Sequence, residues 1–113
     1  MNKEIQIHLK PMSVNEAWCH PGRRYKSKKY KSFTETVLLM LPHLDIPEGN
    51  LGIRIEAGLA KNADLDNICK PILDIIEKKY GCNDNRFLEI KLVKKIIKRK
   101  DKGYFNFSIW GVV

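Results

Sequence analysis

The sequence predicts an α+β domain in which a small mixed or antiparallel sheet is covered on one face by two main helices. Several short segments alternate apolar and polar residues, which is typical of strands with one buried face, and two longer segments repeat apolar residues with a helical period. These segments follow the order β-α-β-α-β-β along the chain. A chain of 113 residues can build one core and is too short for two, so we expect residues 1–113 to form a single domain.

The first half of the chain is expected to contain a strand, a long loop and a helix. Residues 4–10 alternate between apolar and polar side chains, which predicts a strand. Residues 11–27 contain Pro, Ser, Asn and Gly without a regular period, which predicts a loop. Residues 32–44 carry apolar side chains at helical spacing and predict the first helix.

The middle of the chain is expected to form a strand followed by a second helix. Residues 51–59 alternate and predict the strand. The apolar residues after Asp66 follow the i, i+4, i+7, i+8 rule of an amphipathic helix to about Tyr80, and Gly81 provides its stop. Pro71 is tolerated only in or near the first turn, so it places the start of this helix close to Asp66.

Two further strands are expected at the end of the chain, at residues 86–98 and 104–110. The residues between them, 98–103, are strongly basic and are expected to form the tip of a hairpin. A charged hairpin tip is typical of a solvated turn and is equally compatible with a DNA contact.

The composition restricts the class of partner and the compartment. Lys and Arg total 21 against 13 Asp and Glu, and this net charge of +8 favours a polyanionic partner. The start of the chain lacks the apolar run of a signal peptide, and no later segment is long and apolar enough to span a bilayer. The three cysteines form no C-x-x-C pair, which suits a reducing compartment. We therefore expect a cytoplasmic protein without a membrane partner.

A run of basic residues in the first half is the main candidate for DNA binding. Basic side chains neutralise phosphates, and tyrosines interleaved with them, here Tyr25 and Tyr30, can pack on sugars or unstacked bases. The alternative is the solvated, charged start of a helix, and we favour nucleic acid because the whole chain is basic. The predicted contacts are Arg23, Arg24, Lys26, Lys28, Lys29 and Lys31.

Asp64 and Asp66 form the candidate chemical site because they lie where a strand leads into a helix. One of them can be explained as an N-cap whose oxygen accepts a hydrogen bond from the helix backbone. A second carboxylate two residues away adds repulsion between like charges, which a divalent cation would relieve. From spacing alone, the cap and the metal site both remain open.

A longer pattern around these aspartates resembles a known family. Asp64-Leu65-Asp66-Asn67-x-x-Lys70, followed after Gly81 by Asn83-Asp84-Asn85-Arg86, is similar to the signature of RusA-type Holliday junction resolvases. The early Pro11-x-Ser13-x-Asn15 also resembles the opening segment of that family. The resemblance implies a RusA-like fold and a bacterial or phage enzyme that acts in DNA recombination and repair. Such an enzyme is a homodimer that resolves four-way DNA junctions by paired symmetric nicks, with Mg²⁺ as cofactor and Mn²⁺ as a possible substitute.

The resemblance also implies a role for individual residues. Asp64, Asp66 and Asp84 would be the catalytic carboxylates that bind the metal, and Lys70 the essential lysine. On a helix Lys70 lies one turn beyond Asp66, where its charge can act near a phosphate. The alternative for Lys70 is an ordinary i, i+4 salt bridge with Asp66 or Asp74.

The chain departs from the family pattern in three places. Basic residues commonly precede the two aspartates in the family, but Asn62 and Ala63 precede them here and leave only Lys61. Asn83 stands where the first of two aspartates is usual, and Arg86 stands where a Gln-like residue is usual. These departures affect the assignment of Asp84 most.

Chain length also limits the position of Asp84. A helix from about residue 67 to 80 carries the chain roughly 20 Å from Asp66, and four extended residues return it by at most about 14 Å. We therefore hypothesise a homodimer in which each site takes Asp64 and Asp66 from one chain and Asp84 from the other. The apolar faces of this helix and of the last strand are the candidate interfaces.

Taken together, these observations predict a magnesium-dependent, structure-selective DNA endonuclease. The first alternative is a non-catalytic nucleic-acid-binding module in which Asp64 and Asp66 are helix-capping residues. The second is a metal-dependent hydrolase of free nucleotides, which the basic run disfavours because small substrates need no extended basic surface.

Overall fold

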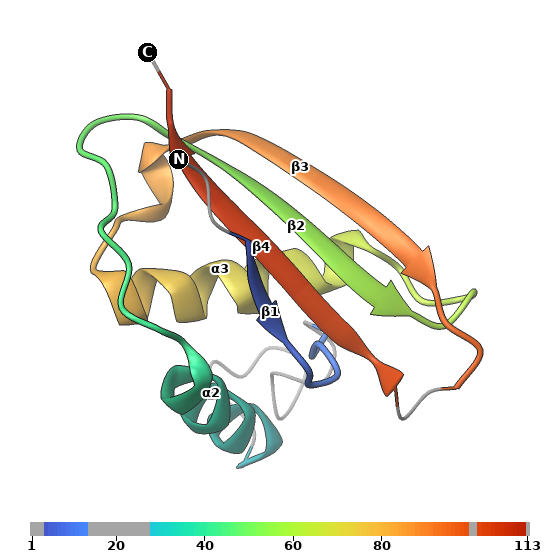
Figure 1. Ribbon diagram of the computed structural model, residues 1–113. Helices are drawn as coiled ribbons and strands as arrows, with labels where there is room; N and C mark the ends of the chain where they lie inside the picture. The colour runs from blue at the N-terminus through green and yellow to red at the C-terminus, as the bar shows by residue number, and fades with distance from the viewer. Residues whose placement is uncertain (1–3, 14–27, 100–101, 113) are drawn as a thin grey trace, which may run out of the picture.

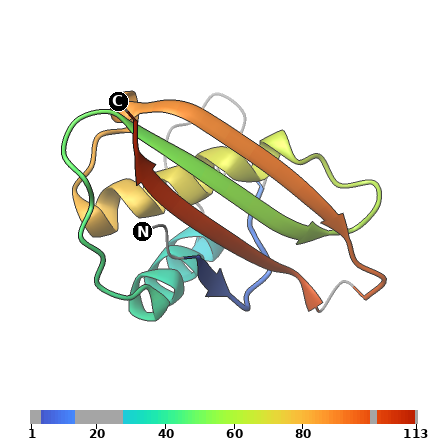
Figure 2. The same cartoon turned by 45° about the horizontal axis from the view of Figure 1, so that its top comes forward.

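A four-stranded mixed sheet and two α-helices make up the computed structural model, which describes residues 4–13, 28–99 and 102–112 (Figure 1). The elements are β1 (Ile5–Ile7), α2 (Lys28–Met40), β2 (Leu51–Leu59), α3 (Asp66–Tyr80), the 3₁₀ turn η1 (Asp84–Arg86), β3 (Phe87–Ile96) and β4 (Tyr104–Gly111). The strands lie in the order β1-β4-β2-β3, and both helices lie on the same face of the sheet (Figures 1 and 2). The predicted α+β class and element order are confirmed.

The inner strand β2 carries the centre of the core. It pairs parallel with β3 on one side and antiparallel with β4 on the other. Its odd-numbered side chains face the helices and are all buried, as the alternation predicted: Leu51, Ile53, Ile55, Ala57 and Leu59.

Two glycines of β2 are covered by aromatic rings on the open face of the sheet. Gly52 pairs with Trp110 and Gly58 pairs with Tyr104 across the β2–β4 ladder. A Cβ atom at Gly52 would lie 2.4 Å from the Trp110 ring, and one at Gly58 would lie 2.3 Å from the Tyr104 ring. The space that other residues would fill with a side chain is therefore taken by these rings.

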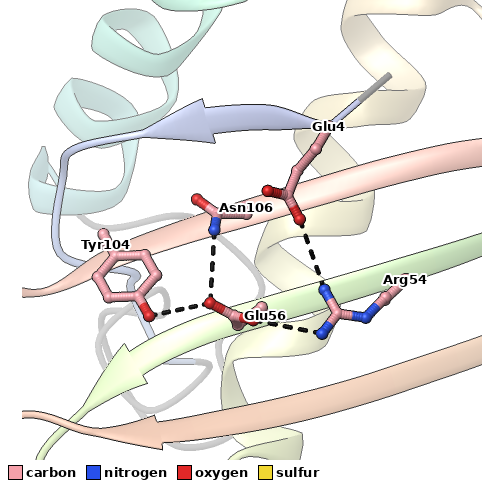
Figure 3. Close-up of polar contacts among 5 residues, drawn as sticks. All are labelled: Glu4, Arg54, Glu56, Tyr104 and Asn106. Carbon is pink, nitrogen blue, oxygen red and sulfur yellow. Dashed lines mark hydrogen bonds and ion pairs between the residues drawn. The ribbon is translucent and has the colours of Figure 1, made fainter. Parts of the chain in front are cut away.

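Between these two pairs, the open face carries a polar network (Figure 3). Glu56 accepts a hydrogen bond of 3.0 Å from the Tyr104 hydroxyl and one of 3.5 Å from the Asn106 amide. Arg54 bridges Glu56 at 3.2 Å and Glu4 at 3.6 Å. The Tyr104 hydrogen bond first, and then the contacts with Arg54, lower the pKa of Glu56 below its usual 4.5.

Helix α2 begins four residues earlier than predicted, at Lys28 rather than at residue 32. The reason is Tyr30, whose side chain is 3% exposed and opens the buried face of the helix. With Phe33, Thr34 and Val37 it completes an i, i+3, i+4, i+7 pattern. The flanking lysines hid the start of this pattern in the sequence.

Helix α3 begins at Asp66 and ends at Tyr80, with Gly81 as its C-cap, close to the predicted limits. Gly81 has a φ of 69° and its N–H donates to the Glu77 carbonyl at 2.8 Å, which is the expected C-terminal stop. The first turn is tight, because the N–H of Asn67 donates to the Asp64 carbonyl at 3.3 Å. Pro71 lies inside the helix, in its second turn, where its missing N–H removes the i→i−4 hydrogen bond to the Asn67 carbonyl, and its ring is buried in the core.

Both surfaces proposed from the sequence as dimer interfaces are already used inside the chain. The apolar face of α3 packs on the sheet and is buried, and so are Phe105 and Phe107 of β4. A buried face cannot pair with a second copy without unfolding the core. This part of the prediction is therefore wrong.

The predicted hairpin between the last two strands is also wrong. β4 pairs with β2 and β1, so β2 separates it from β3. The parallel β2–α3–β3 unit places β3 at the outer edge of the sheet, and β4 then returns on the other side of β2. Within the residues that the structure describes, no helix has the length and apolarity needed to cross a bilayer.

Candidate active site at the start of helix α3

The candidate site lies where β2 ends and α3 begins. This is the carboxyl end of the parallel pair β2 and β3, the edge at which α/β folds commonly carry their functional residues. Lys94 of β3 donates hydrogen bonds to the carbonyls of Lys61 at 2.8 Å and of Ala63 at 2.5 Å. The loop that precedes Asp64 is therefore tied to the neighbouring strand.

Asp64 and Asp66 are both exposed, and neither caps the helix. Leu65 occupies the N-cap position and makes no side-chain cap hydrogen bond. The Asp64 carboxylate accepts only a long hydrogen bond of 3.4 Å from the Asn67 amide, and Asp66 makes no hydrogen bond or ion pair with the rest of the described chain. The alternative that Asp64 or Asp66 is only an N-cap of the helix is therefore not supported by the structure.

Lys70 is held between two carboxylates. Its Nζ atom lies 3.1 Å from Asp74 Oδ1 and 3.3 Å from Asp84 Oδ2. Hydrogen bonding to Asp74, followed by the charge of Asp74 and the contact with Asp84, raises the pKa of Lys70 above its usual value, so the side chain stays charged at neutral pH. The predicted i, i+4 contact with Asp74 is present, and the contact with Asp84 adds to it.

A buried tyrosine supports this cluster from the neighbouring helix. Tyr30 of α2 lies close to Asp74, and burial first, then the charge of Asp74, raises the pKa of Tyr30. Asp74 itself is half-buried. The buried Tyr30 is therefore part of the surroundings of Asp74, the carboxylate that contacts Lys70.

Asp84 is positioned by two of the residues that depart from the family pattern. The Asn83 side chain caps η1 by accepting the Asn85 N–H at 3.1 Å. Arg86 donates to the carbonyl of Gly49 at 2.9 Å and to that of Pro47 at 2.5 Å, which joins η1 to the turn before β2. Both departures therefore have a structural role next to Asp84.

The three predicted metal ligands are not gathered in one chain. Among the described residues no group of three His, Cys, Asp or Glu side chains is placed to hold a metal ion. Lys70 lies about 6 Å along the helix from Asp66 and reaches forward to Asp74. Asp84 contacts the same Lys70 Nζ atom as Asp74 does.

Only half of the predicted DNA contacts lie within the described residues. Lys28, Lys29 and Lys31 are exposed at the first turn of α2, and this turn has no acidic residue. Arg23, Arg24 and Lys26 lie outside the described residues. The proposed stacking of Tyr30 on bases is wrong, because its ring is buried in the core.

Sequence reasoning missed three residues that shape the site, namely Lys94, Tyr30 and Arg86. Each of these residues contacts a partner that is far away in the sequence, so no local sequence pattern predicts its role. In the comparisons with known proteins, no family model matches the chain, and no curated protein matches it.

Proposed function

We propose that the protein is a magnesium-dependent, structure-selective DNA endonuclease of the RusA type that resolves four-way junctions by paired symmetric nicks. One observation carries this proposal. The charged Lys70 contacts Asp74 and Asp84, and it lies one helical turn from Asp66, which is exposed and does not cap the helix. The same residues make up the signature that resembles the RusA family.

The donor set at the start of α3 fits a hard divalent cation. Asp64 and Asp66 offer exposed carboxylate oxygens that the helix does not use as caps, and magnesium prefers one or two carboxylates together with water and substrate phosphate. Magnesium bound there would supply a Lewis acid for the scissile phosphate and a more acidic water. Lys70 would place a fixed positive charge near the phosphate as its negative charge grows.

The first turn of α2 supports contacts with the DNA backbone. Three lysines at a helix N-terminus oppose the helix dipole, and a bound phosphate would relieve this repulsion. These lysines would therefore position the duplex arms without reading their sequence: Lys28, Lys29 and Lys31.

A homodimer completes the proposal. A four-way junction presents two equivalent strands, and a two-fold symmetric enzyme can place one site on each. Because Asp84 contacts Lys70 of its own chain and no group of three carboxylates is gathered among the described residues, the partner's Asp84 would complete each Asp64–Asp66 pair. We place the enzyme in the cytoplasm, where its DNA substrate would be.

The test compares cleavage of a four-way junction with cleavage of a matching linear duplex. End-labelled DNA is incubated with the protein, with Asp66→Asn and with Asp45→Asn, with and without Mg²⁺, and the strands are separated under denaturing conditions. Asp45 is a matched control, since it is an exposed aspartate that contacts only His43 among the described residues. We expect symmetric nicks in the junction that need both Mg²⁺ and Asp66 and that persist in Asp45→Asn.

The main alternative remains a nucleic-acid-binding module without catalysis. Tight binding of the junction without any cleavage, in either Mg²⁺ or Mn²⁺, would favour this alternative and contradict the nuclease proposal.

A further inference from the structure

The outer edge of β3 exposes apolar side chains that the chain itself does not cover. β3 is the last strand of the sheet, and no other strand of the described residues pairs with its outer side. Leu88 is 59% exposed, Ile90 46% and Ile96 63%. An unpaired strand edge with exposed apolar residues is a template for pairing with another strand.

Apart from Lys94, which faces the helices and donates to the loop before Asp64, the charges of β3 lie on the opposite, open face of the sheet. Glu89 pairs with Gly52, Lys91 with Arg54 and Lys95 with Gly58, so these three side chains share that face. Lysines on an edge strand usually discourage pairing. The acidic Glu89 near the start of the strand and Lys95 near its end change this expectation, because they are complementary in an antiparallel pair.

We propose that β3 pairs antiparallel with β3 of a second copy, in a register centred on Leu92. In this register Glu89 lies opposite the partner's Lys95, and by symmetry Lys95 lies opposite the partner's Glu89. Leu88, which the β2–β3 pairing skips, comes next to the partner's Ile96, so the two most exposed apolar residues of the strand lie together. Opposite charges and apolar residues placed directly across a strand pair both stabilise it.

Neighbouring registers are excluded by charge. A two-fold axis perpendicular to the sheet pairs side chains of the same face. The axis must therefore pass beside a residue of β3, not between two consecutive residues. Centring on Lys91 places Lys91 opposite itself, and centring on Val93 places Lys91 opposite the partner's Lys95. Like charges directly opposite each other destabilise a strand pair. The register centred on Leu92 avoids both contacts.

This interface rests on the homodimer in the proposed function and gives it a geometry. The two sheets join into one, and the helices and the Asp64–Asp66 pairs of both copies lie on the same side. The start of one β3, which follows η1, lies beside the end of the other, where Lys94 holds the loop before Asp64. The partner's Asp84 is thereby brought toward the carboxylates that its own chain leaves incomplete.

Charge reversal provides the first test. We measure the dissociation constant of the dimer by sedimentation velocity, over about 1–100 μM protein, for the parent chain, Glu89→Lys, Lys95→Glu and the double variant. Each single change should raise the dissociation constant roughly tenfold to hundredfold, because two symmetric pairs become repulsive, and the double variant should recover the parent value. Glu35→Lys, an exposed change on α2, is the matched control and should have no effect.

Disulfide trapping tests the register itself. Residues directly opposite each other have Cβ atoms about 4.5–5.5 Å apart, close to the span of a disulfide. A mixture of Glu89→Cys and Lys95→Cys chains should cross-link on mild oxidation, whereas each chain alone should not, and peptide mapping identifies the linked residues. Burial raises the pKa of Cys69 and Cys82, so both should react slowly.

Two outcomes would overturn the inference. A parent chain that stays monomeric would remove both this interface and the homodimer of the proposed function. A dimer that ignores Glu89→Lys and gives no cross-link between positions 89 and 95 would show a different interface. In that second case the homodimer and the nuclease proposal would survive.

Discussion

Replacing Lys94 with Met should loosen the loop that carries the first candidate ligand. Lys94 donates two hydrogen bonds from a charged group, to the carbonyls of Lys61 and Ala63. A hydrogen bond to a charged group contributes about 1.5–3 kcal/mol. Because both carbonyls lie near the surface and water can replace the ammonium, we expect a total loss of about 2 kcal/mol in the free energy of unfolding.

Urea denaturation measures this loss. With a slope of about 1–3 kcal/mol per molar urea, the midpoint should fall by roughly 1 M. Lys98→Met is the control, because Lys98 is exposed just beyond β3 and should leave the midpoint unchanged. Met retains most of the Lys94 side-chain volume, so a cavity does not explain the difference.

A second measurement separates the loop from general stability. The affinity for Mn²⁺, followed by water proton relaxation, should fall in Lys94→Met under conditions where the variant is fully folded, because Asp64 follows directly after Ala63. Lys94→Arg keeps the charge and should recover part of this affinity. Unchanged urea midpoint and unchanged Mn²⁺ affinity in Lys94→Met would refute the reasoning.

Three further predictions concern the open face, the shared site and the basic turn. Tyr104→Phe should cost about 0.5–1.5 kcal/mol in unfolding free energy at pH 7. The stability that Glu56 contributes is present above its unfolded-state pKa of 4.5 and is lost as the pH falls through its lower folded-state pKa. The cost of Tyr104→Phe should therefore shrink below pH 4.5. A cost that stays constant with pH in urea denaturation would contradict this prediction. Asp66→Asn and Asp84→Asn should each be inactive alone. If the partner supplies Asp84, an equal mixture of the two variants should have up to about a quarter of its sites intact, because half of the dimers are mixed and each of these has one intact site. If the mixture cleaves no junction, Asp84 belongs to the site of its own chain. The triple variant Lys28→Gln, Lys29→Gln, Lys31→Gln removes three phosphate contacts from each chain of the homodimer, and this should reduce the salt slope of DNA affinity by about 5. An unchanged slope in filter binding would exclude the first turn of α2 from the interface.

The parts of the fold that depend on local periodicity could be predicted from the sequence. β2 alternates strictly because one face meets the helices, and α3 repeats its apolar residues because one stripe meets the sheet. Gly81 marked the end of α3 because only a residue that tolerates a positive φ ends a helix in this way.

The parts that depend on distant partners could not be predicted. Alternation gave β3 and β4 as strands but not their neighbours, since a hairpin and a crossover leave the same local pattern. Tyr30 belongs to the core because α3 lies beside it, and its lysine-rich surroundings in the sequence indicated the opposite.

The candidate site shows the same division. The spacing of Asp64, Asp66 and Lys70 was visible in the sequence because all three lie at one helix start. The contact between Lys70 and Asp84 was not visible, since it depends on how the chain folds back after Gly81. That path is set by Arg86, which binds carbonyls more than thirty residues earlier in the chain.

The two glycines of β2 have a consequence for how the central strands are aligned. Trp110 fits over Gly52 and Tyr104 fits over Gly58 only because those positions have no side chain. A slip of β4 by two residues would drive a ring into Arg54 or Glu56, which occupy the same face. The absence of side chains at Gly52 and Gly58 therefore holds β4 in a single register against β2, the strand from which the chain enters the loop before Asp64.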